Sequence, residues 1–193
     1  MNKSIVVLMV AMVLTMSAFA QETFKVDVSK SDIQWTGEKV TGEHTGNIKF
    51  ESGMLKVKNG KLTGGEFMVD MTSMTNTDLD GEYKDKLMGH LKSDDFFGVE
   101  KHPTSKLTIT SVTHEKGNQY KIKGDLMIKG KMNSIEFPAE VVMAGNKIYG
   151  NAFVTIDRSK YDVKYGSGSF FDNLGDKTIY DNFTLQIKLV AEN

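Results

Sequence analysis

Residues 119–129 read Gln-Tyr-Lys-Ile-Lys-Gly-Asp-Leu-Met-Ile-Lys. The even-numbered positions, from Tyr120 to Ile128, are apolar or glycine, whereas the odd-numbered positions are mostly charged or polar. Successive side chains of a β-strand point to opposite faces of a sheet. The period of two therefore predicts a strand with one buried face and one face in water.

The same alternation recurs along most of the chain, which predicts an all-β protein. Between two of these runs, Asn59-Gly60 is the pair best able to adopt positive φ at both centres of a tight hairpin turn. Long strands joined by such turns predict an antiparallel meander, and closure into one extended barrel of about eight strands removes its exposed edges. The alternating runs outside residues 119–129 are Phe24/Val26/Val28, Ile33/Trp35, Ile48/Phe50, Leu55/Val57, Phe67/Val69/Met71, Leu107/Ile109, Ile135/Phe137/Ala139/Val141/Met143, Ile148/Gly150/Ala152/Val154/Ile156 and Phe183/Leu185/Ile187/Leu189.

Two segments break this pattern. Between Asp78 and Leu91 the apolar residues recur every four positions, which predicts a short amphipathic helix. Pro103 lies beyond it and prevents a helix from continuing into the next strand. The stretch from Tyr165 to Lys177 is rich in Gly, Ser and Asp, and long insertions of this kind form lids or rims. We expect the helix and this loop near the barrel ends.

The charge balance and the lack of cysteine exclude several classes of function. The chain of 193 residues has 24 Lys+Arg against 25 Asp+Glu, so it has no strong field to attract nucleic acid or an anionic membrane. Without cysteine it can form no disulfide, thiolate catalyst or cysteine-containing zinc site. The spacing of the four histidines aims no two imidazoles at one ion, so we expect no metal and no cofactor. They are His44, His90, His102 and His114.

The lysines indicate which way the apolar face points. If the apolar face met lipid, the lysines of the other face would crowd the narrow interior of a small barrel. In the opposite arrangement they meet water at little cost, so we predict a water-soluble barrel with an apolar interior and no stable membrane insertion. These lysines are Lys56, Lys58, Lys61, Lys121, Lys123, Lys129 and Lys131.

Small residues on the inward face leave two interpretations open. Gly124, Gly150 and Ala152 lack the side-chain volume with which Leu or Val would fill the barrel. They either relieve crowding at bends around a solid core or leave a dry cavity for a long, thin apolar ligand. The pair Phe96-Phe97 is open in the same way, because it either plugs the barrel end or closes over a ligand tail.

Residues 1–20 have the parts of a secretory signal peptide. A short positively charged start precedes an apolar core, Ile5 to Met16, and the small-x-small site Ala18-Phe19-Ala20. The core is shorter than the ~20 residues of a membrane-spanning helix, which favours export over a retained anchor. We predict cleavage between Ala20 and Gln21, a periplasmic or secreted location, and one domain over residues 21–193.

One long run resembles the signature of the YceI-like family: Gly89-His90-Leu91-Lys92-Ser93-Asp94-Asp95-Phe96-Phe97-Gly98-Val99-Glu100-Lys101-His102-Pro103-Thr104. The chain departs from that pattern at Lys30, where the family often has a histidine, and at His102, where a tyrosine is usual. The resemblance spans nearly all of residues 21–193. Supporting segments are Val26-Asp27, Ser31 to Trp35, a turn over Gly42 to Gly46 with His44, Gly124 to Gly130, Phe137-Pro138 and Arg158 to Tyr161.

The resemblance implies an extended lipocalin-like antiparallel barrel that holds a polyisoprenoid, such as an isoprenoid quinone or its precursor, along its axis. It implies no catalytic residue. The charge balance already argues against a nucleic-acid partner, and a homodimer is left open. The helix and the Phe96-Phe97 run are the expected gate, and inward side chains are the expected ligand contacts. Together they are Trp35, Phe67, Val69, Leu87, Leu91, Phe96, Phe97, Ile109, Leu126, Ile128, Phe137, Val141, Val154, Ile156 and Leu185.

The leading prediction is an exported protein that sequesters or carries a long isoprenoid lipid, with a stress-related role as one option. A periplasmic enzyme acting on a lipid or on a small amide or ester is an alternative. It needs a nucleophile and a base in the cavity, and the alternation leaves the inward face almost free of titratable groups. A solid-core module that acts through its surface is a further alternative.

Overall fold

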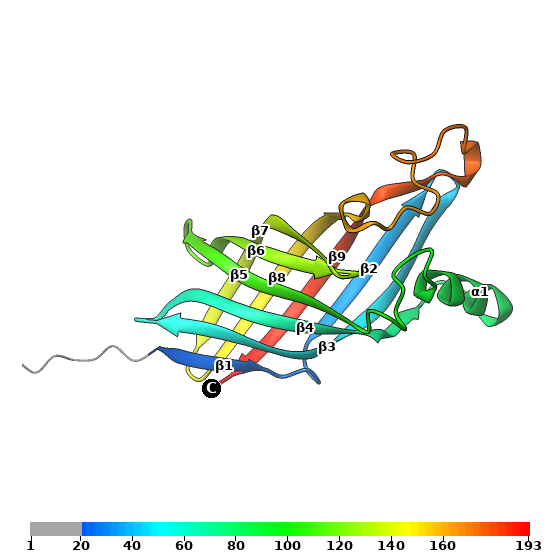
Figure 1. Ribbon diagram of the computed structural model, residues 1–193. Helices are drawn as coiled ribbons and strands as arrows, with labels where there is room; N and C mark the ends of the chain where they lie inside the picture. Colours follow the sequence, from blue (N-terminus) through cyan, green and yellow to red (C-terminus); the bar gives the residue numbers. More distant parts are fainter. Residues whose placement is uncertain (1–20) are drawn as a thin grey trace, which may run out of the picture.

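The computed structural model describes residues 21–193, and the predicted signal peptide lies outside these residues. Nine strands and one α-helix follow one another along this part of the chain (Figure 1). The strands are β1 (Glu22–Val26), β2 (Asp32–Lys39), β3 (Gly42–Lys58), β4 (Lys61–Asn76), β5 (Thr104–His114), β6 (Gln119–Ile128), β7 (Lys131–Ala144), β8 (Lys147–Asp157) and β9 (Ile179–Glu192). The helices are α1 (Gly81–Lys92) and the 3-10 helices η1 (Arg158–Tyr161) and η2 (Gly175–Lys177).

Strands β2 to β9 close into a single antiparallel barrel of eight strands. The sheet runs β3-β2-β9-β8-β7-β6-β5-β4, and pairing of β4 with β3 completes the ring. The short β1 and β2 both pair with β3, one after the other along its length. Residues 22–25 pair with residues 54–57 of β3, and residues 33–39 pair with residues 42–48 of the same strand. The predicted eight-stranded barrel with one short helix is confirmed.

Alternation along β6 places side chains as the sequence predicts. Ile122 and Ile128 are buried inside the barrel. On the outer face, Lys121 is exposed and its Nζ lies 3.1 Å from a carboxylate oxygen of Glu136 on β7. Lys129 is the exception among the lysines predicted to face water: it is half-buried and its Nζ donates to a backbone carbonyl of the loop after α1 at 2.8 Å. The apolar face therefore points inward.

Strand β3 is one long strand where the sequence pattern showed two separate runs. Its inward positions change parity: Ile48 and Phe50 are buried before a register shift against β4, and Leu55 and Val57 are buried after it. The shift lies between Phe50 and Ser52. A β-bulge adds one residue to one strand, so the alternation moves by one position without ending the strand.

Three local predictions are wrong. The expected turn over Gly42 to Gly46 is the start of β3, and the chain turns at residues 40–41. Val28, predicted as an inward strand residue, follows β1 and is exposed. The helix begins at Gly81, because the carboxylate of Asp78 is bound to β3 instead, where it accepts the backbone N–H of Thr45 at 2.7 Å.

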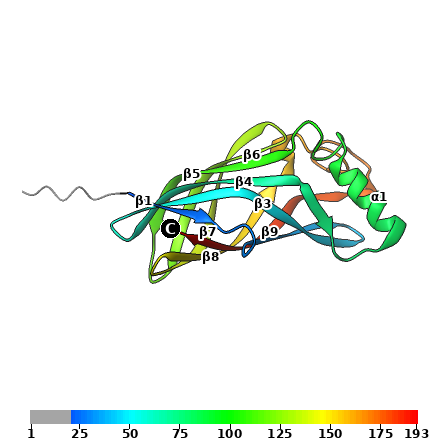
Figure 2. The same cartoon turned by 90° about the horizontal axis from the view of Figure 1, so that it is seen from below.

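The two ends of the barrel differ. Helix α1, the loop between η1 and β9, and the β2–β3 turn gather at one end, called here the α1 end, while β1 and the C-terminus lie at the other (Figures 1 and 2). That other end, called the closed end, is filled by Phe24, Val57, Ile148 and Ala191, which are all 4% exposed or less. Across residues 21–193, no helix has the length and apolar character needed to cross a membrane.

Candidate ligand-binding cavity

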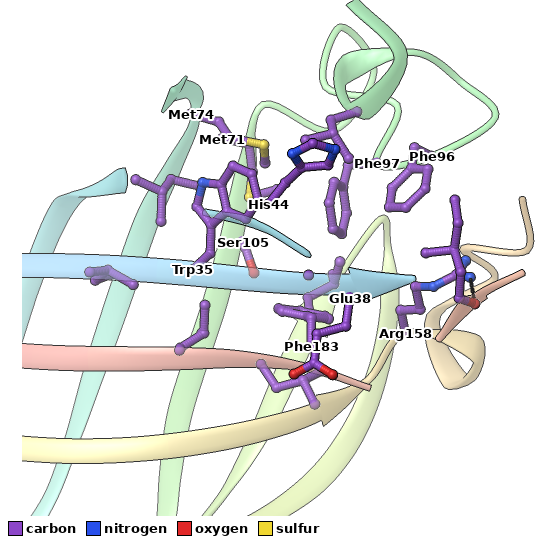
Figure 3. Close-up of a pocket in the computed structure, with 18 of the residues that line it drawn as sticks. Trp35, Glu38, His44, Met71, Met74, Phe96, Phe97, Ser105, Arg158 and Phe183 are labelled. Atoms are coloured by element: carbon purple, nitrogen blue, oxygen red, sulfur yellow. Dashed lines mark hydrogen bonds between the residues drawn. The ribbon is translucent and has the colours of Figure 1, made fainter. Parts of the chain in front are cut away.

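Two adjoining cavities occupy the barrel, and Figure 3 shows the one at the α1 end. This upper chamber has a volume of about 300 Å³, and the lower chamber, toward the closed end, has a volume of about 130 Å³. The two share a stretch of wall, called here the waist, which consists of Ile33, Val69, Leu126, Ile156 and Leu185. The interior is therefore hollow, and the interpretation of a solid core is wrong.

Small inward residues on two neighbouring strands make room for the lower chamber. Ala139 of β7 pairs with Ala152 of β8, and Gly150 of β8 lies two residues away on the same face. Gly124 on β6 has another role, because a Cβ atom there would lie 2.8 Å from the backbone oxygen of Thr108. Of the small residues singled out from the sequence, Gly150 and Ala152 open the cavity, and Gly124 allows β5 and β6 to approach each other.

Every side chain predicted to contact the ligand lines one of these chambers. The upper chamber has Trp35, Leu87, Leu91, Phe96, Phe97 and Ile128; the lower has Phe67, Ile109, Phe137, Val141 and Val154; and Val69, Leu126, Ile156 and Leu185 belong to the waist. They come from the helix, the segment after it and seven of the eight barrel strands, all except β3. Their contact with a ligand stays a prediction.

The segment after α1 covers the upper chamber. Gly98 turns the chain back with φ of +57°, and its N–H donates to the carbonyl of Ser93 at 2.8 Å. Phe96 is buried, and its ring centroid lies 5.2 Å from that of Phe97, which in turn lies 6.1 Å from the ring of Phe183 on β9. The two phenylalanines thus reach from the segment to the barrel wall and form part of the chamber lining (Figure 3).

Helix α1 covers the chamber through few contacts. Leu87 and Leu91 line the chamber, but no residue of the helix is buried and Tyr83 is 74% exposed. Its last turn is attached to β4 where the Nζ of Lys92 donates to the carbonyl of Thr72 at 2.8 Å. Elements with few buried contacts open at low free-energy cost, which suits a gate.

Two histidines connect α1 and the segment before it to the rest of the α1 end. The ring of His90 meets the ring of Tyr165, in the loop before β9, edge-on with centroids 4.1 Å apart. The Nδ1 atom of His44 lies 2.8 Å from the carboxylate of Asp78. Desolvation raises the pKa of Asp78, but hydrogen bonds from His44 and its neighbours outweigh it and hold that pKa below its usual value. Among residues 21–193, no three His, Cys, Asp or Glu side chains gather as metal ligands.

Arg158 lines the upper chamber and was not among the predicted site residues. Its side chain is 2% exposed, and its guanidinium donates to the carbonyls of Val163 at 2.7 Å, Ile179 at 2.9 Å and Tyr180 at 3.1 Å. Burial lowers the pKa of this guanidinium, although Asp181, 3.6 Å away, acts in the opposite direction. Two features of the sequence point to it: Arg158 is the single arginine of the chain, and it opens one of the segments that carry the family resemblance.

Arg158 also forms part of a polar region in the upper chamber. Its guanidinium carbon lies 5.2 Å from the centre of the Phe96 ring, close enough for a cation–π contact. The other polar side chains of this chamber are Glu38, Lys39, His44, His90, Ser105 and Tyr180. Among residues 21–193, Asn151 is the single polar residue that lines the lower chamber. The cavity therefore has a partly polar end and an apolar end.

Known proteins match about half of the chain, and a family profile matches most of it. A protein of Photorhabdus laumondii, UPF0312 protein plu2095, is 31% identical over 103 residues, 53% of either chain. UPF0312 protein ECA1782 of Pectobacterium atrosepticum is 33% identical over 84 residues, 43% of this chain and 42% of its own. The chain spans about half the length of these curated relatives. The profile of the YceI-like domain matches residues 24–191.

Solved structures share the fold. BcnA of Burkholderia cenocepacia superposes with a TM-score of 0.70 at 24% identity, over 86% of this chain and 99% of that one. A polyisoprenoid binding domain from Saccharophagus degradans, implicated in plant cell wall breakdown, gives a TM-score of 0.63 at 14% identity, over 88% and 97% of the two chains. With a family profile matched over residues 24–191, from β1 to β9, this chain belongs to the YceI-like domain family.

Proposed function

We propose that this protein binds a long isoprenoid lipid, of the quinone or precursor type, in its barrel and carries or sequesters it after export. The observation that supports this most is the pair of adjoining chambers, whose walls are apolar for most of their length. The likeness to a polyisoprenoid binding domain supports the choice of ligand class. The N-terminal sequence supports export to the periplasm or beyond.

The energetics favour long tails. Each methylene moved from water into an apolar cavity contributes about 0.8 kcal/mol, while association costs an estimated ~4–15 kcal/mol in lost freedom. A short tail does not offset that cost, whereas a tail that fills both chambers does. We therefore expect affinity to rise with tail length.

The distribution of polar groups supports one orientation for the ligand. Arg158, His90 and Glu38 line the upper chamber, near the gate. Within the part of the chain that the structure describes, no charged side chain lines the lower chamber. A polar head group is best placed in the upper chamber, because it would lose its hydration without compensation in the lower one. The tail then extends through the waist toward the closed end.

A binding role suits this site better than hydrolysis. Among residues 21–193, Ser105 is the only serine that lines the upper chamber, and its hydroxyl donates to the carbonyl of Met127 at 2.7 Å. A serine nucleophile needs a base that accepts its hydroxyl proton. The Ser105 hydroxyl donates to a backbone carbonyl, which cannot act as that base.

Native mass spectrometry of the exported protein tests the proposal. The protein is produced with its own leader, purified from the periplasm without detergent, and compared with a Phe153→Ser variant, whose substituted side chain is 60% exposed on the outside of β8. We expect both to carry the same apolar mass, and chemical analysis to identify an isoprenoid. Reproducible absence of any apolar mass, together with failure to take up an added long prenol, would contradict the proposal.

A further inference from the structure

The lower chamber has a floor that can be followed strand by strand. Ile148 of β8 pairs with Ala191 of β9, and both are 0% exposed. One inward position higher, Gly150 pairs with Leu189, and both line the lower chamber. Gly150 is therefore the part of β8 that lies directly above the floor, and it presents no side chain to the chamber.

The backbone does not require glycine at this position. Gly150 has no positive φ. A Cβ atom added to it would meet Leu189 at 3.6 and 3.7 Å, ordinary van der Waals distances, and nothing else within 4 Å. At Gly124, by contrast, the added Cβ would lie 2.8 Å from the backbone oxygen of Thr108 and 2.9 Å from Leu107. Packing of the strands accounts for Gly124 and leaves Gly150 unexplained.

We infer that Gly150 sets the length of the tail that the barrel accepts. This rests on the proposed function, in which the tail passes the waist and ends above Ile148 and Ala191. Ile156 at the waist and Gly150 are six residues apart on β8, which corresponds to about 20 Å of strand at ~3.3 Å per residue. A side chain at position 150 extends into the chamber and takes the space of the last tail carbons. A tail that ends above the waist is unaffected.

The test compares Gly150→Leu with the wild-type protein over a series of linear prenols of increasing length, added after the bound lipid has been removed. Trp35 is the only tryptophan and lines the upper chamber, so its fluorescence reports tails of every length. We expect equal affinity for short prenols and a loss of tenfold or more for the longest, about fourfold for each methylene excluded. The affinity of Gly150→Ala for the longest prenols should lie between those of the wild-type protein and Gly150→Leu.

A matched control uses the neighbouring position. Tyr149 is 42% exposed on the outer face of β8, so Tyr149→Leu adds no bulk to the chamber and leaves the length profile unchanged. Identical profiles for wild type and Gly150→Leu would overturn the inference while leaving the proposed function intact. Equal losses at every length, seen with Gly150→Ala as well, would also overturn it. A wild-type protein that binds no prenol would overturn the proposed function itself.

Discussion

Arg158 links two segments of the α1 end through its buried guanidinium. It donates to the carbonyl of Val163, just after η1, and to those of Ile179 and Tyr180 at the start of β9. Arg158→Met keeps much of the apolar stem but leaves three carbonyls and Asp181 without the charge that they face. We expect the free energy of unfolding to fall by about 3–5 kcal/mol, measured by urea denaturation.

Lys160 provides the control for this substitution. It lies in the same 3-10 helix, but its side chain is 65% exposed and its only ion pair, with Asp157 at 3.9 Å, is loose. Lys160→Met should change the free energy of unfolding by no more than about 0.5 kcal/mol. If Arg158→Met is as mild as Lys160→Met, the guanidinium contributes little to the α1 end.

Gly46 is the glycine of the barrel with the least room around it. A Cβ atom there would lie 1.8 Å from the backbone oxygen of Thr75 and 2.6 Å from the indole of Trp35. Gly46→Ala must therefore push β3 away from β4, and we expect a loss of about 3 kcal/mol or more in the free energy of unfolding. Gly37→Ala, with nothing within 4 Å of the added Cβ, serves as the control in the same thermal or urea experiment.

At this scale the sequence predicts which side chains face inward but not what each glycine or charge does there. Alternation places Gly124 and Gly150 on the same face, yet one allows close packing of strands and the other borders open space. That difference depends on how close the neighbouring strand lies to each glycine. The sequence of one strand does not reveal this distance. Arg158 was missed for the same reason, because its partners are backbone carbonyls of the chain that follows it.

The turn between β1 and β2 contains an ion pair between Asp27 and Lys30. The carboxylate of Asp27 lies 2.6 Å from the Nζ of Lys30 and accepts the N–H of Ser29 at 3.0 Å. The hydrogen bond from Lys30, followed by that from Ser29, lowers the pKa of Asp27 from 3.8 to about 2. Because the folded pKa lies below the unfolded one, this contribution to stability is complete above about pH 4 and is lost as the pH falls toward 2.

An NMR titration of the Asp27 carboxyl carbon tests this. In Lys30→Ala we expect the pKa of Asp27 to rise toward 3.8, with part of the decrease kept by Ser29. Lys177→Ala, which removes a charge from η2 at the opposite end of the barrel, is the control and should leave the titration unchanged. A wild-type pKa near 3.8 would show that the Asp27–Lys30 contact does not form in solution.

The segment after α1 should control how fast a ligand leaves. Phe97 spans the gap between this segment and Phe183 on β9, with ring centroids 6.1 Å apart. Phe97→Ala removes that ring from the wall of the upper chamber, so we expect release of a long prenol to accelerate about tenfold with little change in association. Stopped-flow fluorescence of Trp35 measures both rates.

Tyr83 on α1 offers a control for this substitution. It is 74% exposed on the outside of α1, so Tyr83→Ala should leave the release rate unchanged. Equal release rates for wild type and Phe97→Ala would mean that the ligand leaves by another path.

Among the elements, those with a strong local pattern were predicted well. The period of two identified β6, β7 and β8 with their inward faces, and the four-residue spacing identified α1. The errors lie where a contact with a distant part of the chain determines where an element begins or ends. The start of α1 depends on Asp78 binding to β3, and the unity of β3 depends on a bulge against β4.

For the whole molecule, closure of the barrel and a hollow interior are separate outcomes. Consecutive strands pair with each other, and closure follows from the pairing of β2 with β9, the first and last strands of the barrel. The removal of exposed strand edges anticipates this pairing. Whether the interior is hollow depends on the total volume of the inward side chains of all eight strands. The alternating pattern does not determine that volume, so it is equally compatible with a filled core. A hollow barrel also forgoes packing contacts that a filled one has, because the atoms lining a cavity lack partners on one side.

A ligand that fills both chambers restores those contacts, so the stability of the protein should depend on its load. Ligand bound only to the folded state adds about 2.7 kcal/mol at a concentration 100 times its dissociation constant. For a barrel of this size about 1 kcal/mol corresponds to roughly 2–4 °C in Tm. We expect delipidated protein to melt about 5–10 °C below protein reloaded with a long prenol, measured by calorimetry. Reloading with a prenol too short to pass the waist should restore little of that difference, and equal Tm values with and without the long prenol would contradict occupancy of the chambers.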